Sequence, residues 1–369
     1  MDILISGGSV AGLTAAALLS RDGHAVTVVE RSDATRHGGV AVDVRGSALD
    51  VARELGIHDR LVANRVGYED RFTFIDRHGV ARAAIEPNTD VYDSPDDIEI
   101  SRDAVVQILA DAVPQDVPVH YRSWIEDLRD TGSVVEVEIG GSSPGRRSFD
   151  LVIGADGLHS RVRHLTFGPE AEFVRHLGLY VGVIRRCSID LGVSGTTVYN
   201  EPGRMVMVRG DGTDQSIILG YRSPLVDYDF RDTAAHRDML TAAFAGEDGW
   251  KFRDVRSEIE TSTDLYFDAV SQTVMPTWTK GRVALIGDAG YCASFFSGMG
   301  TSLAMQGADC LARALGSHSS VSESLAAYCT AMGPVVTDAH SLAGEGAELL
   351  FPATDEDIRR RNETFAAGV

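Results

Sequence analysis

The sequence is poor in cysteine and has no long apolar run. None of its four cysteines is spaced from another as in a C-x-x-C motif, and this pattern disfavours both a metal site and a disulfide framework. We therefore expect no metal ligands and a reducing, cytoplasmic setting. No stretch of about 18 residues is uninterruptedly apolar, so we also expect no membrane-spanning helix.

Basic residues are scarce relative to acidic ones. The chain has 34 lysines and arginines against 54 aspartates and glutamates, which gives a net charge of −20. Such a charge disfavours nucleic acids and anionic membrane surfaces as partners, because both are polyanions. The length of 369 residues and the hydrophobic share of 44% predict a globular protein of about two domains.

The order of segment types predicts an α/β fold. Asp2–Ser6 is typical of a buried strand, Val10–Arg21 of a helix and residues 24–30 of a second strand, which together make one βαβ unit. Residues 149–153 and 282–286 are apolar enough for further parallel strands. Residues 172–223 alternate in the manner of an antiparallel sheet. We expect a Rossmann-like nucleotide-binding domain with an inserted, mostly antiparallel substrate domain and a C-terminal helical segment.

The same patterns predict where the domains begin and end. The nucleotide-binding domain is expected to be discontinuous and to combine residues 1–70, 97–170 and 277–333. The substrate domain is expected to contain residues 71–96, which begin with a hairpin, and residues 171–276. Residues 334–369 are expected to form the C-terminal helices.

Residues 5–13, ISGGSVAGL, nearly match the G-x-G-x-x-G fingerprint of dinucleotide-binding folds. Gly7 and Gly12 occupy the outer positions, while Ser9 replaces the middle glycine, where the backbone approaches a pyrophosphate closely. Glu30 follows Gly12 by 18 residues, near the spacing of an acid that binds a ribose hydroxyl. Taken alone, these residues also fit a glycine turn with a surface glutamate.

Two later segments combine a predicted strand with a glycine-containing loop. Residues 151–163, LVIGADGLHSRVR, place Asp156 after a strand, where open α/β sheets bind ligands. Residues 283–306, VALIGDAGYCASFFSGMGTSLAMQ, place Asp288 at the end of another strand. In that segment Gly300 opens a helix whose N-terminus favours negative charge. Each segment alone also fits an ordinary turn or helix start.

In this order and spacing, the three motifs resemble those of the class A flavoprotein monooxygenases. This para-hydroxybenzoate hydroxylase-like group includes aromatic hydroxylases and tetracycline-inactivating monooxygenases, and the resemblance extends over nearly the whole chain. It implies FAD, reduced by NADPH or NADH. It also implies that O2 adds to flavin C4a as a hydroperoxide and hydroxylates a hydrophobic small molecule of aromatic or polyketide type. No protein nucleophile or metal is needed, and we expect a monomer or homodimer.

The resemblance also implies roles for individual residues. The cofactor is expected to contact the three motifs and the loops beside them: Gly7, Gly8, Ser9, Val10, Ala11, Gly12, Glu30, Arg31, Asp43, Arg45, Arg102, Asp156, Gly287, Asp288, Gly298, Gly300 and Thr301. Side chains on the antiparallel strands and after Asp288 are candidates for a substrate pocket: Tyr180, Ile184, Tyr199, Met205, Met207, Tyr221, Tyr291 and Phe295. Arg185 or Arg222 would meet an anionic substrate. Taken singly, each strand residue is more typical of ordinary sheet core.

One loop departs from the family pattern. After Gly287-Asp288 the family usually has a histidine and one or two prolines, whereas residues 291–295 of this chain are Tyr-Cys-Ala-Ser-Phe. The difference leaves the geometry beside the flavin open. Alternative functions are a reductase or halogenase on the same fold, or a flavin-binding protein that has lost hydroxylase activity. The three tryptophans stand apart from one another, unlike the paired tryptophans of a halogenase.

Overall fold

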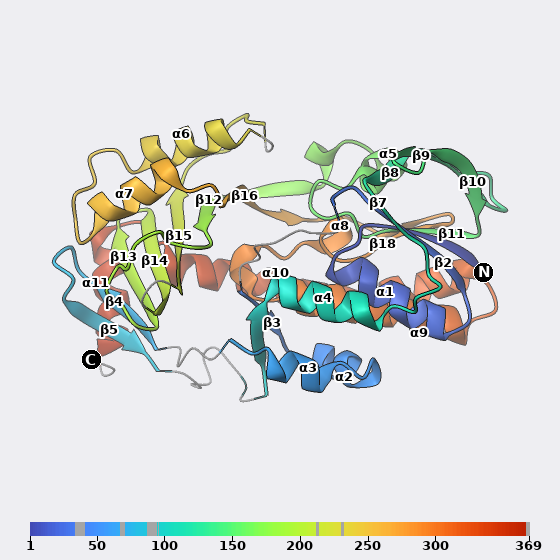
Figure 1. The fold of residues 1–369 in the computed structure, drawn as a ribbon, viewed down its shortest axis with the longest axis horizontal. Helices are drawn as coiled ribbons and strands as arrows, with labels where there is room; N and C mark the ends of the chain where they lie inside the picture. The colour runs from blue at the N-terminus through green and yellow to red at the C-terminus, as the bar shows by residue number, and fades with distance from the viewer. Residues whose placement is uncertain are drawn as a thin grey trace. The chain divides into compact units, whose positions relative to one another are not determined.

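The computed structural model describes residues 1–33, 41–66, 71–86, 94, 96–211, 214–229 and 232–366. The chain divides into two compact units, drawn in Figure 1. The first unit consists of Met1–Val66, Asp96–Arg175 and Ser271–Ala343. The second unit consists of Gly67–Pro95, His176–Val270 and Gly344–Val369. Each unit therefore combines segments that are far apart in the sequence.

The first unit is built on a six-stranded sheet. In spatial order its strands are β17 (Thr279–Lys280), β18 (Val283–Leu285), β11 (Leu151–Gly154), β1 (Asp2–Ser6), β2 (Ala25–Glu30) and β7 (Val119–Tyr121). All neighbouring strands are parallel except β17, which pairs antiparallel with β18. Strands β11 and β18 are buried along their whole length, because a parallel sheet has elements on both of its faces. The Rossmann-like part of the expected α/β fold is confirmed.

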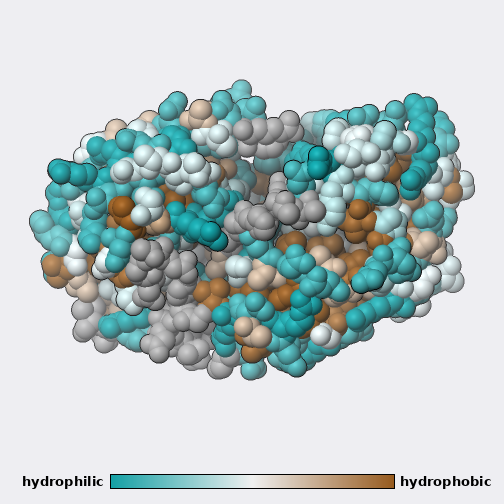
Figure 2. Space-filling view, in the orientation of Figure 1, coloured by the Kyte–Doolittle hydropathy of each residue, from teal (hydrophilic) through white to brown (hydrophobic). Residues whose placement is uncertain are grey.

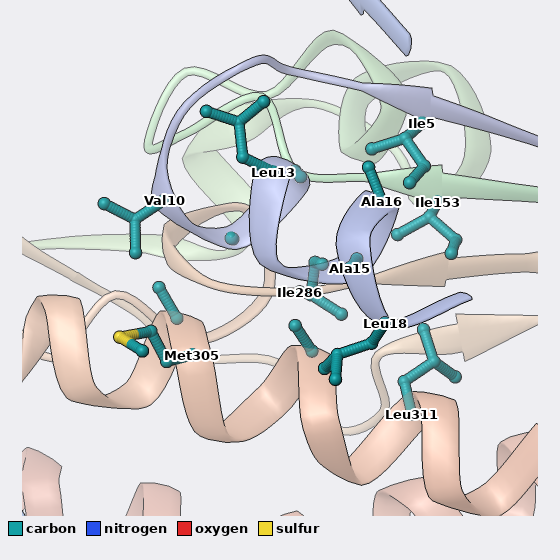
Figure 3. Packing of buried hydrophobic residues seen from close by; sticks show 14 of the residues in the cluster. Ile5, Val10, Leu13, Ala15, Ala16, Leu18, Ile153, Ile286, Met305 and Leu311 are labelled. Atoms are coloured by element: carbon teal, nitrogen blue, oxygen red, sulfur yellow. The ribbon is translucent and has the colours of Figure 1, made fainter. Parts of the chain in front are cut away.

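Two helices form the core beside this sheet. Helix α1 (Val10–Arg21) packs against α9 (Gly300–Ser317). Figure 3 shows the side chains that meet there: Val10, Leu13, Ala15, Ala16 and Leu18 from α1, Met305 and Leu311 from α9, and Ile5, Ile153 and Ile286 from the sheet. Alanines along α1 allow the two helices to approach closely, so the start of each helix is held in a fixed place relative to the sheet.

Smaller elements complete the first unit. They are α2 (Ser47–Glu54), α3 (His58–Ala63), α4 (Arg102–Ala112), α5 (Arg161–Phe167), η1 (Glu170–Glu172), α8 (Asp288–Tyr291) and η2 (Phe295–Ser297). Strand β3 (Ala41–Val44) pairs with β6 (Ile98–Ser101). A separate three-stranded antiparallel sheet contains β8 (Ser123–Asp130), β9 (Val135–Gly141) and β10 (Gly145–Phe149).

The second unit is dominated by a seven-stranded, mostly antiparallel sheet. Its spatial order is β16 (Leu265–Thr273), β12 (Val174–Ile184), β15 (Asp214–Arg222), β14 (Arg204–Asp211), β13 (Thr196–Glu201), β4 (Phe72–Ile75) and β5 (Ala81–Ile85). Strands β4 and β5 form the expected hairpin. Helices α6 (Thr233–Ala243) and α7 (Phe252–Thr261) lie on one face of the sheet, as Figure 1 shows. The inserted antiparallel sheet is thus confirmed.

The C-terminal helices differ from the expected separate segment of residues 334–369. Helix α10 (Val321–Leu350) begins before that segment and runs through Pro334. Its buried positions continue at intervals of three or four residues on both sides of the proline: Leu325, Tyr328, Met332, Val336, Ala339 and Ala343. The division between the units falls after Ala343, within this helix. A continuous apolar stripe therefore maintains the helix although the proline removes one backbone hydrogen bond.

Helix α11 (Asp355–Thr364) is fastened to the second unit by a buried arginine. Arg361 is only 8% exposed, and its guanidinium lies 3.9 Å from the ring centroid of Phe74. Arg361 Nη1 donates to Asn200 Oδ1 at 2.6 Å and to the Leu349 carbonyl at 3.2 Å. Burial lowers the pKa of Arg361 to about 10. Helix α11 therefore packs against the sheet of this unit.

Hydrophilic residues predominate on the face shown in Figure 2, and hydrophobic residues emerge in separate patches among them. Within the described ranges, no helix is both long enough and apolar enough to cross a bilayer. The same residues contain no group of three or more histidine, cysteine, aspartate or glutamate side chains arranged to hold a metal ion.

Arg361→Ala should destabilise the protein by about 2–4 kcal/mol, because it removes buried hydrogen bonds and leaves their acceptors without a donor. Urea unfolding measures this change. Arg359 lies on the same helix but is 68% exposed and pairs with the equally exposed Glu356, so Arg359→Ala should change stability by less than about 0.5 kcal/mol. Equal effects of the two substitutions would contradict the assignment of Arg361 as the anchor.

Candidate functional site

The loop between β1 and α1 requires both of its outer glycines. Gly7 has φ +115°, and a Cβ there would lie 2.2 Å from the carbonyl oxygen of Ala155. A Cβ on Gly12 would lie 1.9 Å from the carbonyl oxygen of Gly7. Any side chain at either position would overlap backbone atoms. This close packing distinguishes the loop from an ordinary surface turn and is the role expected of the first and third glycines of a dinucleotide fingerprint.

Ser9 replaces the middle glycine of the fingerprint without backbone strain. Its φ of −108° and ψ of −162° are extended values that most residues adopt. The Ser9 hydroxyl accepts a hydrogen bond from Nη2 of the exposed Arg102 at 3.2 Å. Among the described residues, no side chain caps the first turn of α1. Backbone N–H groups and a guanidinium therefore meet at this loop, a combination that suits a phosphate.

Glu30 is held against the same loop by two backbone donors. The Gly8 amide donates to Glu30 Oε2 at 2.6 Å, and the Ser32 amide donates to Oε1 at 2.7 Å. A Cβ on Gly8 would come within 3.0 Å of the Glu30 Cβ, so the second glycine allows the end of β2 to approach the loop. Arg31 follows as an exposed residue. The glutamate is thus placed beside the loop rather than being an incidental surface acid.

The second motif contacts the first through its backbone, whereas the side chain of its aspartate binds residues of the same motif. Asp156 accepts hydrogen bonds from Ser160 Oγ at 2.5 Å, from the Arg161 amide at 2.8 Å and from the Val162 amide at 3.1 Å. Burial raises the pKa of this carboxyl group. The carboxylate therefore fixes the first turn of α5, while Ala155, its neighbour, packs against Gly7.

The third motif meets the first at the start of α1. Gly287, with φ +61°, follows the strand β18, and a Cβ there would lie 3.0 Å from the Ala11 Cβ. Asp288 begins α8 directly after it. Because Gly7 contacts Ala155 and Gly287 contacts Ala11, all three motifs converge on the first turn of α1.

The start of α9 is joined to β3 by a serine that the sequence did not single out. The Arg45 amide donates to Ser302 Oγ at 2.9 Å, and Ser302 Oγ donates to the Asp43 carbonyl at 3.2 Å. Arg45 also pairs with Asp43 at 3.1 Å. Gly298 (φ +63°) lies beside these two side chains, ahead of Gly300 and Thr301 at the helix start. A polar side chain in the first turn of an apolar helix was the available signal for Ser302.

Arg163 links the second motif to the third, a role that its position in the motif did not reveal. It is fully buried. Its Nη1 donates to the Ala289 carbonyl at 3.0 Å, and its Nη2 donates to the Leu158 carbonyl at 2.5 Å and to Glu170 at 3.1 Å. Burial lowers the pKa of Arg163. This side chain therefore fixes the loop around Asp156 relative to the turn that begins at Asp288.

Tyr291, which was expected to line a substrate pocket, lies in the core instead. It is fully buried, and its Oη lies 3.1 Å from Tyr328 Oη, which also lies 2.8 Å from the Leu285 carbonyl oxygen. A Cβ on Gly307 would lie 1.8 Å from Tyr291 Oη. The α8 turn thus directs the ring into the core, where glycine in α9 leaves room for it. Phe295, the other pocket candidate from this loop, is 39% exposed and is therefore not part of the core.

The candidate pocket residues of the second unit lie on two opposite faces of its sheet. Four of them share a buried cluster with Leu240 of α6 and Phe252 of α7: Tyr180, Ile184, Tyr199 and Tyr221. Tyr180 and Tyr221 stack at 5.3 Å. These four residues form core beneath helices and not a pocket wall, which corrects the expectation.

Met205 and Met207 face away from that cluster. They alternate along β14 with Val206 and Val208, which belong to the cluster, and alternate side chains of a strand point to opposite faces. Met207 lies opposite Val198 and Ile218 on the neighbouring strands. The two methionines therefore belong to a second apolar face of the sheet.

Both candidate anion-binding arginines already have protein partners. Arg185 pairs with Asp264, and Arg222 Nε donates to the Phe351 carbonyl at 2.9 Å. These contacts give both arginines a structural role in the second unit, and contact of either one with an anionic substrate stays a prediction.

Comparisons with known proteins place the chain among flavoproteins. Residues 1–342 match a family model described as an FAD binding domain. An uncharacterized protein of Mycobacterium tuberculosis (strain ATCC 25618 / H37Rv) is 39% identical over 318 residues, which are 84% of this chain and 83% of the relative. A flavin-dependent monooxygenase of an unknown prokaryotic organism is 34% identical over 366 residues, 98% of this chain and 94% of the relative. The crystal structure of tetracycline destructase Tet(55) superimposes with a TM-score of 0.84 and 32% identity, covering 99% of this chain and 94% of that one.

Gly12→Ala should destabilise the protein by about 3 kcal/mol or more and abolish FAD retention, because its Cβ would overlap the Gly7 carbonyl. Ser9→Gly should retain FAD and lose less than about 1 kcal/mol, since it changes backbone entropy and removes one exposed hydrogen bond from Arg102. Flavin absorbance after gel filtration and urea unfolding measure both effects. The steric explanation is wrong if the alanine variant keeps the cofactor as well as the glycine variant does.

Arg163→Met should destabilise the protein by about 3–5 kcal/mol and weaken FAD retention, because Glu170 and two carbonyl groups lose their buried donor. Arg163→Lys should have an intermediate effect, since lysine has fewer donors in a different geometry. Arg161→Met is the matched control, because that neighbouring side chain is exposed, and it should cost less than about 1 kcal/mol. A similar loss in both methionine variants would argue against the proposed link.

Proposed function

The chain belongs to the class A flavin-dependent monooxygenases, the FAD-binding family that its sequence matches, and on this premise we propose its reaction. The protein uses NADPH or NADH and O2 to hydroxylate a hydrophobic small molecule of aromatic or polyketide type. The observation that supports this proposal best is the convergence of three motifs on the first turn of α1. Gly7 contacts Ala155 there, and Gly287 contacts Ala11.

The residues around this turn fit FAD. Backbone N–H groups of α1 and the Arg102 guanidinium suit a diphosphate, and the glycines allow the surrounding backbone segments to pack closely enough to present these groups together. The Glu30 carboxylate, fixed by two amides, suits a sugar hydroxyl as its donor. We assign the diphosphate to the Gly7–Gly12 loop and the ribose to Glu30. Asp288 and the start of α9 are assigned to the remainder of the cofactor.

When bound, FAD supplies the redox chemistry and the activated oxygen. The protein's own contribution is to bind, orient and shield. The positive end of the α9 dipole favours negative charge near Gly300 and Thr301. Arg163 and Ser302 keep the surrounding loops in place through the hydrogen bonds described above. A preorganised set of donors needs no rearrangement as charge develops, which is how such sites lower a barrier.

The substrate proposal is a polycyclic phenol of the tetracycline kind. It is supported by the likeness to a tetracycline destructase at 32% identity over nearly the whole chain. The second apolar face of the sheet in the second unit, which includes Met205, Met207, Val198 and Ile218, is at most 5% exposed and is core like the tyrosines beneath α6 and α7. We therefore assign substrate contact to neither face of this sheet.

The assay combines purified protein, FAD and NADPH or NADH with tetracycline, a naphthol and a monocyclic phenol. We expect yellow protein, faster NAD(P)H oxidation with at least one polycyclic compound, and a product heavier by one oxygen atom. Heat-inactivated protein with the same free FAD is the control. Protein that retains FAD but neither accelerates NAD(P)H oxidation nor inserts oxygen with any of the three compounds would contradict the hydroxylase proposal.

A further inference from the structure

Ser294 combines two unfavourable features in the loop between α8 and α9. Its φ of 94° and ψ of 161° lie in a region that is essentially restricted to glycine. It is only 6% exposed, and among the residues that the structure describes its Oγ has no hydrogen-bond partner. A strained backbone and an unsatisfied buried hydroxyl both reduce stability. Residues with such costs tend to occur at functional sites.

The strain has an identifiable origin, because the chain is fixed on both sides of Ser294. Before it, the Thr273 amide donates to the Cys292 carbonyl at 3.0 Å. Gln272 Nε2 donates to the Ala293 carbonyl at 3.2 Å and to the His340 carbonyl at 2.9 Å. The loop is therefore tied to the end of β16 and to α10 up to the residue that precedes Ser294.

After Ser294 the chain is fixed again. Ser297 Oγ donates to the Ser294 carbonyl at 2.9 Å, and the Met299 amide donates to Ser297 Oγ at 3.2 Å. These bonds lead the chain into the start of α9. Ser294 is therefore the residue at which two anchored segments are joined, and its backbone takes up the difference in direction between them.

Phe295 directly follows this junction, so the backbone angles of Ser294 set the direction in which the Phe295 side chain leaves the chain. Its side chain is 39% exposed, although it is large and apolar, and its ring stands edge-on to Phe296 with the centroids 5.1 Å apart. It lies between Asp288 and Gly300, both of which we assign to the cofactor. An exposed aromatic ring in this loop is suited to contact another aromatic ring.

We propose that Ser294 is a strained positioning residue that holds the ring of Phe295 in place as an aromatic contact for the substrate. The substrate part rests on the polycyclic hydroxylase function proposed above. The strain part concerns the polypeptide alone and can be tested without turnover.

The stability experiment compares melting temperatures of the full chain without added substrate. Ser294→Gly should raise the melting temperature by about 2–4 °C, because glycine adopts this φ without strain and the buried hydroxyl is lost. Ser294→Ala removes the hydroxyl but keeps the strain, so its increase should be smaller. In a Gln272→Ala background, the gain from Ser294→Gly should shrink, since one of the two anchors has been released. A melting temperature of Ser294→Gly at or below that of the unmodified protein overturns the proposal.

The kinetic experiment uses the panel polycycle with the fastest turnover. Ser294→Gly should raise KM about two- to tenfold with a smaller change in kcat, which is the loss expected for one aromatic contact. Phe295→Leu should raise KM similarly without the gain in melting temperature. Phe295→Tyr keeps an aromatic ring and should leave KM close to that of the unmodified protein. An unchanged KM in Ser294→Gly overturns the positioning role even if the melting temperature rises. If the unmodified protein turns over none of the panel, the hydroxylase proposal and the substrate contact are both contradicted, while the melting temperatures still decide whether Ser294 is strained.

Discussion

The close approach of backbone segments around the first turn of α1 is the constraint on which the candidate site depends. The Gly7 carbonyl occupies the space that a Cβ of Gly12 would need, and the Ala155 carbonyl occupies the space that a Cβ of Gly7 would need. Gly287 approaches Ala11 on the other side. Side chains at these positions would push the three loops apart. Their absence brings the helix N-terminus, Glu30 and Asp288 to one edge of the sheet.

Buried polar contacts keep the loops in this arrangement. Arg163 joins the loop of Asp156 to the turn after Gly287, and Ser302 joins the start of α9 to β3. Asp156 fixes the first turn of α5. Each of these groups is expensive to bury without a partner, so the observed bonds define one arrangement of the loops. The exposed Arg102 guanidinium lies at the same loop, where its Nη2 donates to the Ser9 hydroxyl.

Much of the fold could be predicted from local patterns. Continuous apolar runs identified the parallel strands β11 and β18, and alternation identified the antiparallel sheet of the second unit. The C-terminal region was harder to predict. A proline usually marks a helix boundary, yet the apolar stripe of α10 continues through Pro334, because packing of that stripe outweighs one lost backbone hydrogen bond. Alternation also could not show which sheet face the helices cover, so Tyr180 and Met207 were assigned to the same pocket although they lie on opposite faces.

The sequence by itself determined the three motifs, their order and the α/β class, because glycine spacing and hydrophobic period are local properties of the chain. Only the tertiary structure decided that Tyr291 points into the core, that Arg163 connects two motifs and that Ser294 is strained. These outcomes depend on groups that are distant in sequence: Gly307 leaves room for a ring, Ala289 offers a carbonyl, and Gln272 anchors a loop. A local pattern carries no information about which distant atom will occupy the neighbouring space.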